Sequence, residues 1–146
     1  MNILRGISTL TILVSSRILF DREAGIALSR INKGGYMNTT EQNETATKIA
    51  ALNDAARSNA LNYMATRGVV ALEEVTISEV FTKVQNFTKF TEDNDPYGEH
   101  DFGSFEVAGN KVFWKIDYYT EDLSSGCDPL DPRCRRVLTI LLAEEY

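Results

Sequence analysis

The chain has 146 residues, of which 25% are charged and 43% hydrophobic, and its formal net charge is −6. This composition is ordinary for a soluble globular domain, and no apolar run approaches the ~20 residues that a membrane-spanning helix needs. The acidic balance, with a pI of about 4.8, argues against nucleic acid as a partner, because binding phosphates requires a basic surface.

Residues 1–36 differ in charge from the rest of the chain. They carry five basic and two acidic groups, whereas residues 37–146 carry ten basic and nineteen acidic ones, a net charge of −9. A secretory signal fits poorly, because polar residues interrupt the apolar stretch and no small-residue cleavage site follows; a transit peptide or a disordered tail remains open. Residues 33–36 can be encoded by a purine-rich string that recruits bacterial ribosomes to a start codon at Met37. We therefore expect 1–36 to be a non-native or disordered leader and 37–146 to form one domain.

The first predicted element is a helix from Thr39 or Thr40 to about Arg57. Thr39-x-x-Gln42 has the form of a capping box. Behind it, apolar residues recur at helical spacing, and the charged residues, among them Asp54 and Arg57, fall on the remaining positions. A short strand is predicted next, where Leu61, Tyr63 and Ala65 alternate with other residues before Gly68.

A second helix is predicted to begin at Thr76-x-x-Glu79, another capping box. Its apolar stripe keeps to steps of three and four residues, which is typical of a helix face packed in a core. The stripe consists of Ile77, Val80, Phe81, Val84, Phe87 and Phe90.

Two later runs alternate as strands do. Gly109-Asn110 is a two-residue turn signal, and counting outward from it pairs Phe105 with Trp114 and Val107 with Val112 on one apolar face. We expect Trp114 to lie in the core between this hairpin and the second helix. Residues 136–145 are apolar on both faces, which predicts a central strand. The predicted fold is α+β, with two helices packed on one face of a small antiparallel sheet of three to four strands.

The segment 93–103 between the second helix and the hairpin is the candidate site. It holds the only histidine, four carboxylates, one proline and two glycines. A calcium loop fits poorly, because Tyr97 stands where Asp or Asn belongs and Ser104 stands where a bidentate Glu belongs. An acid-base or metal site would use one imidazole with nearby carboxylates. The catalytic candidates are His100, Asp101, Glu99 and Asp95, and the metal candidates are His100, Asp93 and Asp95.

A structural role is the favoured interpretation of the same segment. Asp93, Asn94 and Asp95 would cap the second helix and form Asx turns, and His100 would bond to backbone or to a carboxylate such as Asp95 or Asp101. The cysteines, Cys127 and Cys134, bracket a loop of turn-forming Asp-Pro steps. They would form a disulfide in an exported chain and stay as thiols in the cytosol.

Three stretches resemble a known family: Asn94-Asp95-Pro96-Tyr97-Gly98-Glu99-His100-Asp101-Phe102-Gly103, Phe113-Trp114-Lys115-Ile116-Asp117-Tyr118-Tyr119, and residues 136–146. From about Leu52 onward the chain is similar to the bacterial domain-of-unknown-function family numbered three-seven-six-eight. Members are typically short proteins associated with plasmids or mobile elements, so the resemblance implies a setting rather than a mechanism.

We therefore expect a small acidic, non-enzymatic accessory protein of a bacterial mobile element that modulates a host or defence factor. It would be cytoplasmic, with a protein partner, no cofactor, no nucleic acid and no membrane. The alternative is a small metal-dependent hydrolase or lyase-like enzyme built on the candidate segment. The residues expected to contact a partner are Asn94, Tyr97, Glu99, His100, Trp114, Asp117 and Tyr119.

Overall fold

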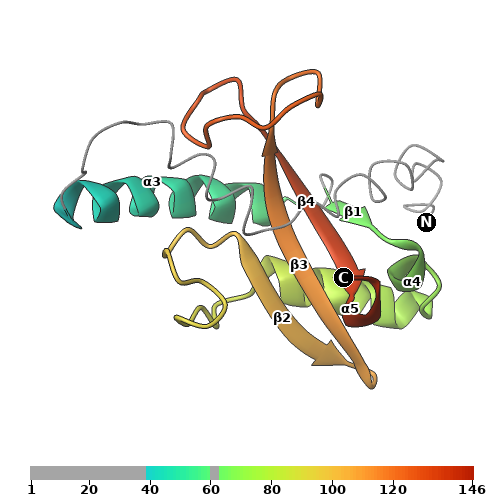
Figure 1. Cartoon of the computed structure of the whole chain (residues 1–146). Helices are drawn as coiled ribbons and strands as arrows, with labels where there is room; N and C mark the ends of the chain where they lie inside the picture. Colours follow the sequence, from blue (N-terminus) through green and yellow to red (C-terminus); the bar gives the residue numbers. More distant parts are fainter. Residues whose placement is uncertain (1–38, 60–62) are drawn as a thin grey trace.

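The computed structural model describes residues 39–59 and 63–146 (Figure 1). The predicted start at Met37, the leader 1–36 and Leu61 of the short predicted strand lie outside these residues. The elements in chain order are α3 (Thr39–Arg57), β1 (Tyr63–Ala65), α4 (Arg67–Val70), α5 (Glu74–Gln85), β2 (Phe102–Val107), β3 (Asn110–Tyr119), β4 (Arg135–Leu142) and the 3-10 helix η3 (Ala143–Glu145). Among the described helices, none is both long and apolar enough to cross a membrane.

The strands form one sheet in the order β1-β4-β3-β2, which confirms the α+β class and the four-stranded size. The sheet is mixed rather than wholly antiparallel: β2–β3 and β3–β4 are antiparallel, whereas β1 runs parallel to β4. Alternation along a strand predicts its faces but not its direction. The parallel partner of β1 is β4, and the long connection that a parallel pair needs runs through α4, α5, β2 and β3.

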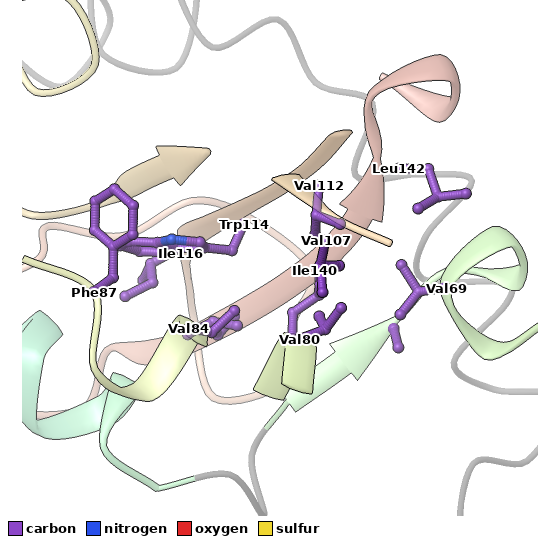
Figure 2. Close-up of a cluster of buried hydrophobic side chains, with 12 residues drawn as sticks. Val69, Val80, Val84, Phe87, Val107, Val112, Trp114, Ile116, Ile140 and Leu142 are labelled. Carbon is purple, nitrogen blue, oxygen red and sulfur yellow. The ribbon is translucent and has the colours of Figure 1, made fainter. Parts of the chain in front are cut away.

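One face of the sheet carries the core (Figure 2). Trp114 is fully buried there, with its ring 5.4 Å from that of Phe87, and it belongs to the same cluster as Val80 and Val84 of α5. This confirms the predicted position of Trp114. In Figure 1, α5 crosses the sheet, whereas α3 extends away from it and only its C-terminal half approaches the strands.

The register of the β2–β3 hairpin differs from the prediction by two residues. Phe105 pairs with Val112 and Val107 with Asn110, so the turn residues are Ala108 and Gly109, not Gly109 and Asn110. Both have positive φ, at 47° and 76°, as a type I′ turn requires. A shift of two residues keeps every side chain on its predicted face, so the apolar face is correct although the pairing is not.

The second helix also differs from the prediction at both ends. It begins at Glu74 with Glu73 as N-cap, so Thr76 lies buried in the first turn and is not a cap. It ends at Gln85, so Phe87 and Phe90 follow the helix instead of belonging to it, although both rings still pack near Trp114. Within the described residues, α3 is already helical at Thr39.

The strand β4 is buried on both faces from Val137 to Leu142, which confirms a central strand. It ends three residues earlier than predicted, because the Glu145 carboxylate folds the chain back. That carboxylate accepts the backbone N–H of Leu142 at 3.0 Å and of Gly68 at 2.8 Å, together with the hydroxyl of Thr66.

Candidate functional site

The segment 91–100, which we call the acidic loop, is held in shape by its own side chains. Asn94 accepts the N–H of Thr91 at 3.0 Å and donates to the carbonyl of Lys89 at 2.9 Å. The Asp95 side chain is only 3% exposed, and its Oδ1 accepts the N–H groups of Glu99 and His100 at 2.9 and 3.2 Å. These are the expected Asx-type contacts. They do not cap α5, however, because that helix has already ended at Gln85.

His100 connects the acidic loop to α3. Its backbone is left-handed, with φ of 54°, and its ring lies parallel to that of Phe90 with 3.8 Å between centroids. Nδ1 is 3.0 Å from Oδ2 of Asp54, whereas Nε2 is 3.9 Å from Oδ2 of Asp95. The carboxylate partner is therefore mainly Asp54, which the sequence analysis did not select.

A buried amide, Asn53, is the next link in this network. The residue is 0% exposed. Its Nδ2 donates to the carbonyl of Glu99 at 2.8 Å and to the Tyr118 hydroxyl at 2.6 Å, and its Oδ1 accepts from Nε of Arg136 at 2.9 Å. Burial raises the pKa of Tyr118, and the nearby charges of Asp101 and Glu99 raise it further. The phenol is therefore neutral and accepts the amide N–H.

Arg57 joins α3 to the end of α5. Its guanidinium donates to the carbonyls of Val84 and Gln85 at 2.8 and 3.1 Å and to Asp54 at 2.7 Å. It also lies 5.3 Å from the centre of the Trp114 ring, a cation–π arrangement. One arginine thus satisfies open carbonyls at the helix C-terminus and orients the carboxylate that holds His100.

Sequence reasoning missed Asn53 and Arg57 because both are polar. Together with Ile49 and Ala50 they make up the buried face of α3, and positions 49, 50, 53 and 57 follow steps of three and four. That spacing was the available signal. It places Asn53 and Arg57 on the same face of α3 as Ile49 and Ala50, and apolar residues at this spacing indicate a buried face.

The remaining predicted interaction residues do not form one surface. Tyr97 lies in the acidic loop and is 42% exposed, whereas Trp114 is fully buried and offers no side chain to a partner. Asp117 and Tyr119 alternate with Trp114 along β3 and so face the opposite side of the sheet. There Asp117 pairs with Lys115 at 2.9 Å. Burial raises the pKa of Asp117, and Lys115 partly opposes that rise.

The candidate catalytic and metal residues converge only in part. Asp101 is bound through its carbonyl, which accepts the N–H of Ile116 at 2.8 Å, and Asp93 is exposed. Within the described ranges 39–59 and 63–146, no three His, Cys, Asp or Glu side chains gather closely enough to hold a metal ion.

The two cysteines form a disulfide, Cys127–Cys134. Both line an open pocket of about 340 Å³ together with Thr120, Glu121, Asp122, Asp131 and Arg133. Of the two states left open by the sequence, the structure therefore has the bonded one.

Comparison with known proteins gives a family and no further relative. Neither a curated protein nor a solved structure matches the chain. The family model described as "Protein of unknown function (DUF3768)" matches residues 65–145, a range that contains the acidic loop and the strands β2, β3 and β4 but not α3. The match covers more than half of the chain, which therefore belongs to the DUF3768 family.

Proposed function

We propose that this domain is a non-enzymatic interaction protein that binds a basic surface of a partner protein through the acidic loop. The setting, a bacterial mobile element acting in the cytoplasm on a host or defence factor, rests on the family resemblance. The observation that carries the proposal is that the loop is fixed on its inner side while Tyr97 stays 42% exposed.

Preorganisation supports this function. Asn94 and Asp95 bind backbone groups of the same segment, and His100 binds Asp54 of α3, so these contacts shape the loop before any partner arrives. A binding surface that is already ordered avoids the entropy cost of ordering on association. Tyrosine is enriched among the residues that dominate binding energy, because it buries a large rigid area and keeps a polar hydroxyl.

Charge indicates the kind of partner. Residues 91–101 contain five carboxylates and neither lysine nor arginine. Glu92 and Asp93 are exposed and come directly before Asn94 and Asp95, which are partly buried and buried. An acidic surface of this kind accelerates encounter with a basic protein and opposes binding to nucleic acid.

Affinity capture from a bacterial host lysate tests the proposal. The domain should retain a protein that Tyr97→Ala releases, and retention should weaken as salt screens the charges. Val75→Ala is the matched control, because Val75 is 73% exposed at the other end of α5. It should retain the same protein. The proposal would be contradicted if Tyr97→Ala retained the captured protein as well as wild type does. It would also be contradicted if no protein were captured and the domain turned over a substrate.

An enzyme built on His100 is the second candidate, and one observation favours it. The imidazole is 30% exposed and has Asp54 on Nδ1, and a carboxylate in that position is how proteins orient a histidine base. Thermal melts of wild type and His100→Asn, with and without Zn²⁺ or Mn²⁺, separate the two functions. A rise in Tm with metal that only wild type shows would favour the enzyme.

A further inference from the structure

The disulfide Cys127–Cys134 is placed where a reductant can reach it. Both cysteines are half-buried and line the open pocket beside Glu121, Asp122 and Asp131. A disulfide that is accessible to solvent can exchange with an incoming thiolate, whereas one enclosed in a core cannot.

Three consecutive hydrogen bonds lead from the disulfide-closed ring to the acidic loop. Pro129, inside the ring, offers its carbonyl to the guanidinium of Arg136 at 2.5 Å. The Nε of Arg136 donates to Oδ1 of Asn53 at 2.9 Å. The Nδ2 of Asn53 in turn donates to the carbonyl of Glu99 at 2.8 Å.

The middle of this path is shielded from water, because Asn53 is 0% exposed. Hydrogen bonds in such surroundings are stronger than in water, and an unpaired group there is costly. A change at one end of the path therefore alters the other. Arg136 has few alternative positions, since its guanidinium also lies 5.5 Å from the centre of the Tyr118 ring.

We infer that Cys127–Cys134 is a thiol–disulfide exchange site whose redox state controls the order of the acidic loop. A thiolate of a dithiol reductant attacks one sulfur and breaks the bond between Cys127 and Cys134, forming a mixed disulfide. The second thiol of the reductant then displaces the protein thiolate. The reductant gives up two electrons and two protons and becomes a disulfide, while the protein gains two thiols.

Opening the ring frees the Pro129 carbonyl from Arg136, and the acidic loop loses part of its support. If the loop is the binding surface, which rests on the proposed function, the reduced protein binds its partner more weakly than the oxidised one. In a reducing cytosol the pair would be held open until an incoming disulfide takes up the two electrons and two protons and closes it by the reverse exchange.

Amide hydrogen exchange tests the site without any partner, so its result does not depend on the proposed function. The oxidised protein is compared with the same protein reduced by dithiothreitol under native conditions. We expect the amides of Glu99 and His100 to exchange about threefold faster or more after reduction, a size typical of coupling within one hydrogen-bonded network. The amides of Trp114 and Ile140 in the sheet should not change.

Two variants complete the test. Cys127→Ser combined with Cys134→Ser should show the faster exchange at Glu99 with or without dithiothreitol, which excludes a direct effect of the reductant. In Arg136→Gln the path is cut, so reduction should no longer change exchange at Glu99. The inference is overturned if Glu99 and His100 exchange equally in both redox states, if the native disulfide resists dithiothreitol, or if reduction unprotects Trp114 and Ile140 as well.

Discussion

At the scale of single residues, Asn53 connects three parts of the domain through one buried side chain. Its side chain binds a carbonyl of the acidic loop, a hydroxyl on β3 and a guanidinium on β4. Three elements distant in sequence therefore meet at one amide on α3. Removing that amide takes a hydrogen-bond partner from each of these groups, and an unsatisfied buried polar atom destabilises a protein more than the lost bond alone.

We expect Asn53→Ala to lower the free energy of unfolding by about 2–3 kcal/mol, because the Glu99 carbonyl and the Arg136 guanidinium each lose a buried partner. Denaturant unfolding followed by Trp114 fluorescence measures it. Asn43→Ala is the control, since Asn43 is exposed on the same helix and the intrinsic helix propensity changes equally. If both variants lose the same stability, the network around Asn53 contributes nothing.

The same residues show where prediction from sequence stops. The Asx contacts of Asn94 and Asp95 could be predicted, because they are formed within a few residues of each other. The partner of His100 could not, since Asp54 lies 46 positions away in the sequence. Nothing local distinguishes Asp54 from the exposed charges around it.

At the scale of elements, β2 and β3 fit together through a missing side chain. Gly103 pairs with Trp114 across the hairpin. A Cβ at position 103 would lie 2.5 Å from Nε1 of Trp114 and 2.8 Å from the Phe87 ring. The absence of that carbon is what allows the indole to lie flat in the core.

We expect Gly103→Ala to lower stability by about 1–3 kcal/mol through overpacking. Gly126→Ala is the matched control, because a Cβ there would meet only a carbonyl oxygen at ordinary contact distance, 3.8 Å. Thermal unfolding of both variants gives the comparison. Equal melting temperatures would show that the core shifts to accept the methyl group without cost.

The faces of these strands could be predicted from their alternation, whereas the hairpin register could not. Two registers that differ by two residues bury the same side chains, so the pattern alone does not choose between them. The observed register is the one in which Ala108 and Gly109, both with positive φ, form the two-residue turn. The C-terminal end of α5 could not be predicted either, because a residue distant in sequence, Arg57, binds the last carbonyls of that helix.

At the scale of the whole molecule, two partly buried tyrosines make stability depend on pH. Burial raises the pKa of Tyr63 to about 12, and burial also raises that of Tyr118. In the unfolded chain a tyrosine titrates near its ordinary pKa of 10.0. Both groups therefore keep their protons in the folded state at a pH where the unfolded chain loses them.

We expect stability to be unaffected by these groups below about pH 10 and to fall as the pH rises from there toward 12, because the folded state binds more protons than the unfolded one. Urea unfolding at several alkaline pH values measures the slope. Tyr63→Phe should make the decline shallower. A decline equally steep in that variant would show that Tyr63 titrates normally.

The α+β class could be predicted because it depends on patterns within each element. The parallel pairing of β1 with β4 could not, because two strands separated by more than half of the described chain carry no local sign of their partnership.

The order of the strands along the chain also affects folding during synthesis. The central strand β4 is the last of the four to be synthesised. During translation β1 and β3 therefore lack the strand that pairs with both of them. Contacts of such long sequence separation slow folding. The nascent chain therefore exposes two unpaired strand edges until residues 135–142 emerge, and that interval is when chaperones or aggregation compete with folding.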